Sequence, residues 1–161
     1  MKKFLSVTIA IILLIATLSG CQTSSSSSNS KPKPTTAEGI VKSLQNSNMP
    51  ITKIEVYTEK NDPNKLLGRP GQYISKANFL DSRIDEPVSN NIEVINGGSI
   101  EVFANKNDAQ KRYEYVSSIA QSSPMFNEYD YLIDKVLLRL SKNLTPEEAK
   151  EYADKLQEIL K

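Results

Sequence analysis

The 161-residue sequence has no histidine and no tryptophan, and its single cysteine is Cys21. These absences exclude serine–histidine triads, cysteine–histidine nucleophiles and the common zinc sites. One cysteine allows no disulfide within the chain, so the folded part must be stable through its core alone. A metal site would need oxygen ligands only, and the nearest candidate, 61–64, lacks the alternating ligands of a calcium loop. We therefore expect no cofactor and no metal site.

The surroundings of Cys21 indicate lipid attachment. The chain starts with Met1-Lys2-Lys3, and an apolar run follows over residues 4–18. A helix of about 15 residues spans about 22 Å, less than the ~30 Å hydrocarbon core, so the run is typical of a signal peptide. Leu18-Ser19-Gly20-Cys21 resembles the lipobox of bacterial membrane lipoproteins. The resemblance implies cleavage before Cys21 and a diacylglyceryl group on its sulfur. An uncleaved N-terminal anchor helix is the alternative.

We expect three segments: a signal peptide at 1–20, a lipidated and disordered tether at 21–36, and a single domain at 37–161. The tether is rich in serine, lysine and proline, and residues 22–36 include no aromatic or aliphatic side chain. Such a segment cannot bury enough apolar surface to fold. Two acyl chains on one residue give stable membrane anchoring. The protein should therefore be held at the outer face of the cell membrane through Cys21.

The charge of the domain argues against nucleic acid as a partner. Four of the 20 lysine and arginine residues precede residue 38, whereas none of the 19 acidic residues does. The domain thus carries sixteen basic against nineteen acidic residues, a net charge of −3. Nucleic-acid binding depends on a basic surface. Besides the membrane, we expect the partner to be an envelope protein, a peptide or a cell-wall component.

Apolar periodicity predicts an α+β fold of two layers, a mainly antiparallel sheet with helices packed on one face. Strands are expected over 53–59, 73–80, 91–104 and 129–140, the last interrupted near Asp134, with Asn96-Gly97-Gly98 as a hairpin or bulge. Three helices are expected. The first begins at Thr35-Thr36-Ala37-Glu38, which has capping-box spacing, the second after Asn105 or Asn107, and the third after Thr145, where TPEE is a capping-box sequence. A ferredoxin-like arrangement, with 99–140 as one half, is one alternative.

Four strings of the domain carry a resemblance: DPNKLLGRPGQY (62–73), SKANFLDSR (75–83), GGSIEVFANKNDA (97–109) and VLLRLSKNLTPEEA (136–149). They are similar to a family of small secreted proteins and lipoproteins of Gram-positive bacteria that has no assigned activity. The resemblance covers most of residues 53–160 and implies one intact domain. It implies no catalytic residues.

The loop at 61–71 and the strand after it hold the candidate binding residues. Arg69 stands between a glycine and a proline, which shape the local backbone. Lys76 is expected on the outer face of the next strand, and Asp81 and Arg83 are two residues apart and share a face. The alternative is that Arg69 pairs with Asp81 as internal structure. The predicted binding residues are Arg69, Lys76, Asp81 and Arg83.

Catalysis without histidine or cysteine would require paired carboxylates. Asp81, Asp85 and Glu86 lie close in the sequence, and Asp130 and Asp134 are four apart. A glycosidase also needs a deep cleft with an aromatic floor, which a domain of this size seldom has. We therefore expect a non-enzymatic interaction domain. The alternatives are a carboxylate-based cell-wall hydrolase and a phage-exclusion or immunity-type lipoprotein.

Overall fold

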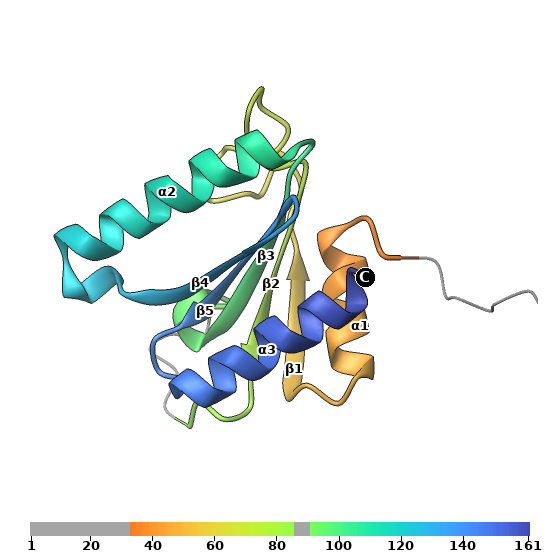
Figure 1. Ribbon diagram of the computed structural model, residues 1–161, viewed down its shortest axis with the longest axis vertical. Helices are drawn as coiled ribbons and strands as arrows, with labels where there is room; N and C mark the ends of the chain where they lie inside the picture. The colour runs from red at the N-terminus through yellow and green to blue at the C-terminus, as the bar shows by residue number, and fades with distance from the viewer. Residues whose placement is uncertain (1–32, 86–90) are drawn as a thin grey trace, which may run out of the picture. The chain divides into compact units, whose positions relative to one another are not determined.

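The residues described by the computed structural model, 33–85 and 91–161, form an open antiparallel sheet of five strands with three helices (Figure 1). The strands lie in the order β1-β2-β3-β5-β4. The predicted α+β class with a mainly antiparallel sheet is therefore confirmed. In chain order the elements are α1 (Ala37–Asn46), β1 (Ile51–Val56), β2 (Ser75–Asp81), the 3-10 helix η1 (Val94–Asn96), β3 (Gly97–Val102), α2 (Lys106–Ser122), the 3-10 helix η2 (Pro124–Phe126), β4 (Glu128–Ile133), β5 (Val136–Ser141) and α3 (Pro146–Ile159).

Each described α-helix begins directly after a side chain that caps it. The caps of α2 and α3 are predicted ones, whereas the cap of α1 is Thr36 and not Thr35, with which the predicted capping-box spacing begins. The Thr36 hydroxyl accepts a hydrogen bond from the backbone of the first turn of α1, and Asn105 does the same for α2. At α3, Thr145 and Glu148 form a reciprocal capping box around Pro146. Each cap satisfies a backbone N–H that has no partner within its helix, which contributes roughly 1 kcal/mol.

One face of the sheet is apolar and carries α1 and α3. Alternate residues of the central strands, including Phe79, Ile100 and Leu138, pack there against α1 and against Tyr152 of α3. Full burial of each large apolar side chain contributes about 1.5–3 kcal/mol, so this cluster is the main core. α1 and α3 thus meet the expectation of helices on one face of the sheet, whereas α2, described next, does not.

Helix α2 adds a smaller cluster on the opposite face. Its residues Ala109 and Val116 pack with Tyr73, Phe103 and Leu137. Leu137 and Leu138 are adjacent in β5, so their side chains point to opposite faces of the sheet, and Leu138 belongs to the main core. Figure 1 accordingly shows α2 on the other side of the sheet from α1 and α3.

The prediction of a hairpin or bulge at Asn96-Gly97-Gly98 is wrong, because the register of β3 with β2 and β5 is regular through the glycines. Residues 94–96 form η1, and the two glycines are the first residues of β3. A Cβ atom on Gly97 would collide with the backbone of β2, and one on Gly98 would lie 2.5 Å from the Phe79 ring. The glycines therefore allow the close approach of β3 to its neighbours and do not form a turn.

The ferredoxin-like alternative is met only in part. β3, α2, β4 and β5 form a split βαβ unit, because β5 pairs antiparallel with both β3 and β4 and lies between them. The complete arrangement needs a further strand after its second helix, and none follows α3 in the described residues. The strand expected over 129–140 is the β4–β5 hairpin, which turns at Asp134 with φ +57°.

The predicted signal peptide, Cys21 and most of the predicted tether lie outside the described residues. Within 33–85 and 91–161, no helix combines the length and the apolarity needed to cross a bilayer. The described residues belong to one compact unit.

Candidate functional site

The face of the sheet opposite α1 and α3 is polar, although most of it is buried beneath α2 and the loop at 57–74. Burying charged groups is unfavourable unless they are paired and hydrogen-bonded, so each buried charged side chain on this face is expected to have a partner. We call it the polar face; its residues are Lys76, Asn78, Ser99, Glu101, Arg139 and Ser141.

Glu101 lies at the centre of the polar face and is completely buried. Its carboxylate accepts hydrogen bonds from Arg112 Nε at 2.9 Å and from Arg139 Nη1 at 3.2 Å. Arg139 also forms a two-pronged pair with Glu128, at 2.9 and 3.0 Å. Burial alone would raise the pKa of Glu101, but Arg139 and Arg112 together bring it below its ordinary value. This chain of charges joins α2, β3, β5 and β4.

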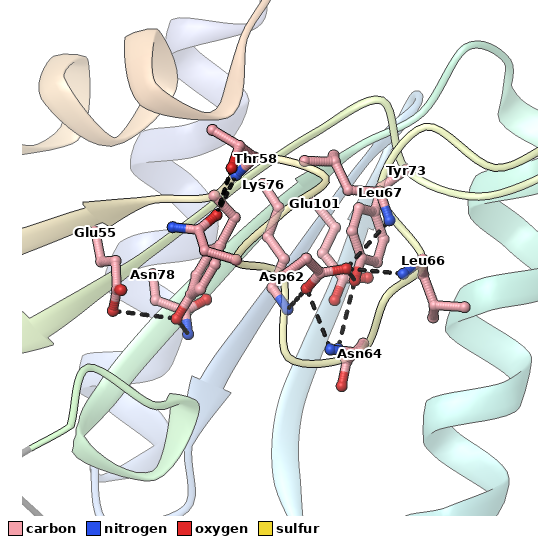
Figure 2. A network of polar contacts seen from close by, with 12 residues as sticks. Glu55, Thr58, Asp62, Asn64, Leu66, Leu67, Tyr73, Lys76, Asn78 and Glu101 are labelled. Carbon is pink, nitrogen blue, oxygen red and sulfur yellow. Dashed lines mark hydrogen bonds and ion pairs between the residues drawn. The ribbon is translucent and has the colours of Figure 1, made fainter.

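Asp62 joins the loop at 57–74 to the polar face (Figure 2). Its Oδ2 accepts hydrogen bonds from the Tyr73 hydroxyl at 2.6 Å and from the N–H groups of Leu66 and Leu67, while its Oδ1 lies 3.3 Å from Lys76 Nζ. Burial would raise the pKa of Asp62, but these hydrogen bonds, Tyr73 first, lower it to about 2. Asp62 therefore fixes the shape of the loop from inside the domain.

The prediction that Lys76 lies on an outer face is wrong. Its side chain is only 4% exposed, and Nζ lies between Asp62 and the rings of Tyr57 and Tyr73, 4.9 and 5.3 Å from their centroids. Burial lowers the pKa of Lys76, although Glu101 and Asp62 act in the opposite direction. Because the loop covers this side of β2, the ammonium group is a structural cation and is not accessible to a partner.

The structure does not bring the four predicted binding residues together. Asp81 is buried against α3, where it accepts hydrogen bonds from Tyr152 at 2.8 Å and from Arg83 at 2.7 and 3.0 Å. Arg83 also reaches Glu151 of α3 at 3.0 Å, so this pair ties the end of β2 to α3. Arg69 is exposed near the tip of the loop, and the alternative pair of Arg69 with Asp81 is not formed.

Two adjoining hollows of about 440 and about 640 Å³ open beneath α2, and Val116, Ile119 and Arg139 border both. We call them together the α2 groove. Its rim holds exposed apolar side chains of α2 and η2: Tyr115 is 57% exposed, Met125 73% and Phe126 57%. This groove could not be found from the sequence, because its residues come from separate segments. The only local signal is Met125-Phe126 directly after Pro124, outside any periodic element.

Three buried side-chain oxygens have no hydrogen-bond partner among the described residues: Asn78 Oδ1, Ser99 Oγ and Asp130 Oδ1. An unsatisfied buried polar atom costs about 1–3 kcal/mol. For Asp130, burial and the neighbouring Glu128 raise the pKa to about 7. In the described part of the chain no group of three or more acidic side chains is placed to hold a metal ion. Among the described residues, Asp130 is therefore the acidic residue that has a buried carboxylate oxygen without a hydrogen-bond partner.

No protein-family model matches the chain, and neither does any curated protein or solved structure. The family resemblance of the sequence therefore stays a prediction. Any proposal for the function therefore depends on the polar face, the α2 groove and Asp130.

Proposed function

We propose that the protein is a lipid-anchored lipoprotein at the outer face of the cell membrane whose domain binds a partner without catalysing a reaction. The partner is an envelope protein, a peptide or a cell-wall component. The observation that carries this proposal is the α2 groove, where Tyr115, Met125 and Phe126 are exposed beside Arg139. Aromatic residues, methionine and arginine are enriched at interaction surfaces, and a cluster of exposed apolar side chains is typical of a binding site.

The geometry favours binding over the alternative of a carboxylate-based hydrolase. Glycosidases hold their two carboxyl groups about 5–9.5 Å apart across the scissile bond. Asp130 and Glu128 are two residues apart on one face of β4, and Glu128 helps to raise the pKa of Asp130, so the two carboxyl groups are neighbours on one strand and do not face each other across a cleft. Asp134 is in the β4–β5 turn, paired with Lys106 at 3.0 Å. A phage-exclusion or immunity role would be one use of the same binding domain.

Replacing the lipidation residue should separate the protein from the membrane. We expect Cys21→Ser to accumulate either in the medium or as an unprocessed precursor. Serine lacks the sulfur that would carry the diacylglyceryl group, so the variant would have neither of the two acyl chains. Cell fractionation with mass spectrometry of the N-terminal peptide measures this. A processed serine variant that still requires detergent for extraction from membranes would show that the anchor lies elsewhere.

The α2 groove can be tested on intact cells with a photoreactive amino acid in place of Phe126. We expect one discrete crosslinked species, because this side chain borders the groove and is exposed. The matched control carries the same amino acid in place of Glu158, which is exposed on α3 on the opposite side of the sheet. Added wild-type protein should compete for the crosslink, and added Phe126→Ala protein should compete at least about tenfold less well. Identical products from both positions, or none from Phe126, would contradict the proposal.

A further inference from the structure

The two edges of the described sheet differ in how they are protected. β1 carries a bulge between Ile51 and Lys53, and Thr52 and Lys53 are exposed there. Bulges and lysines are common devices that prevent an edge strand from pairing with another chain. β4 has a continuous register from Glu128 to Ile133 and contains no lysine and no proline. In the described part of the chain, its backbone hydrogen-bonds to β5 only. β4 therefore keeps a row of unpaired N–H and C=O groups.

A hollow of about 580 Å³ lies along this open edge. Four consecutive residues of β4, from Asp130 to Ile133, line it. Successive side chains of a strand point to opposite faces, so four in a row can border one hollow only if it follows the edge of the strand. α2 contributes one wall and α3 the other. We call this hollow the β4 slot; its walls are Gln110 and Tyr113 of α2 and Lys150, Ala153, Asp154 and Gln157 of α3.

The group of buried charged side chains that borders the β4 slot has one more acidic residue than it has basic residues. Asp130 lies opposite Arg139 in the β4–β5 register, and its Oδ1 has no partner among the described residues. The raised pKa of Asp130 agrees with this deficit, because a further cation beside it would lower that pKa. Among the described residues, the ion-paired group around Arg139, with Asp130 beside it, has three acidic residues against two basic ones: Glu101, Glu128 and Asp130 against Arg112 and Arg139.

We propose that the β4 slot binds an extended segment of a partner protein as a sixth strand, with a lysine or arginine of that segment paired to Asp130. In this mode of recognition the main-chain hydrogen bonds give affinity and alternate side chains give specificity. A second copy of β4 does not suit the slot, because the strand EYDYLI has two carboxylates and no basic residue, and like charges would face each other. The β4 slot and the α2 groove share no lining residue.

Synthetic peptides test the proposal on the full chain in detergent micelles. One pool of seven-residue peptides has a central lysine among alternating valine, threonine and tyrosine, and a second pool has glutamate at that position. We expect the lysine pool to shift the backbone amide resonances of residues 128–133 and to leave those of residues 51–56 unchanged. The glutamate pool should bind about tenfold more weakly, since it places a like charge beside Asp130. N-methylation of alternate peptide amides should abolish the shifts, because it removes the ladder donors.

Two variants separate the charge contact from the strand contact. Asp130→Asn keeps the size of the side chain and should reduce the preference for lysine to less than about twofold. Asp134→Asn makes the same change in the β4–β5 turn, outside the slot, and should retain the full preference. Shifts that are absent from residues 128–133 with both pools, or equal at β1 and β4, would overturn the proposal. A lysine preference unaffected by Asp130→Asn would overturn the assignment of Asp130 as its partner.

Discussion

Glu101→Gln is expected to lower the free energy of unfolding by about 3–5 kcal/mol, the range found when one partner of a buried ion pair is removed. Glutamine keeps the volume of the side chain, so the change reports on charge and not on packing. It would leave Arg112 and Arg139, whose side chains are 9% and 16% exposed, without their shared carboxylate. Arg139 would keep Glu128, whereas Arg112 would lose its only ion pair in the described residues. Urea denaturation followed by circular dichroism measures the effect.

The matched control for this prediction is Glu158→Gln. Glu158 is exposed on α3, and its partner Lys155 is three residues away on the same helix. Surface pairs of this kind contribute about 0–1 kcal/mol, so the control should change the stability little. If Glu101→Gln were no more destabilising than the control, the buried charges would not be coupled as the geometry indicates.

The second large effect is expected for Gly97→Ala, which should destabilise the domain by about 3 kcal/mol or more through overpacking. The added Cβ would collide with the Phe79 carbonyl oxygen and would lie 2.8 Å from the Asp81 nitrogen and 2.9 Å from the Leu80 Cα. These are backbone atoms of β2, which cannot move away without disrupting the β2–β3 ladder. Thermal unfolding should show a midpoint lowered by roughly 10 °C for a domain of this size.

Gly39→Ala is the control for Gly97→Ala. Gly39 lies in the first turn of α1, and an added Cβ would have its nearest neighbours at 3.2 Å, in the side chains of Pro34 and Thr36. Alanine also favours the helical conformation, so the stability should change by less than about 1 kcal/mol. Equal effects of the two substitutions would mean that β3 can tolerate a side chain at its first position.

The features that could be predicted from the sequence are those that depend on near neighbours. Thr145 and Glu148 are three residues apart and cap α3 with groups from within one turn. The apolar periodicity of a strand or a helix can likewise be recognised within a short stretch of sequence. The hairpin prediction at Gly97 failed for a local reason as well: glycine permits both a turn and a close strand contact, and the sequence does not distinguish them.

The polar face could not be predicted, because its partners come from separate elements. Lys76 and Glu101 alternate with apolar residues, a pattern that is typical of strands with one exposed face. Their burial depends on α2 and on the loop that Asp62 organises, and neither contact is visible in the spacing of residues. The sequence placed Asp81 and Arg83 on one face but left Arg69 as the alternative partner of Asp81; the structure pairs Asp81 with Arg83, and the contacts that bury this pair come from Tyr152 and Glu151 of α3, which are distant in the sequence.

The way α1 begins has a mechanical consequence. The N–H of its first residue, Ala37, donates to Ser75 Oγ at 2.9 Å, and Ser75 is the first residue of β2. Tension applied to the chain ahead of Thr36 would therefore reach α1 and β2 together and would not peel the helix away one turn at a time. If a partner is bound at β4, the force passes from β2 to β4 through β3 and β5, so the hydrogen-bond ladders β2–β3, β3–β5 and β5–β4 bear it in series. The pulling force that the domain withstands would then be set by the weakest of these ladders.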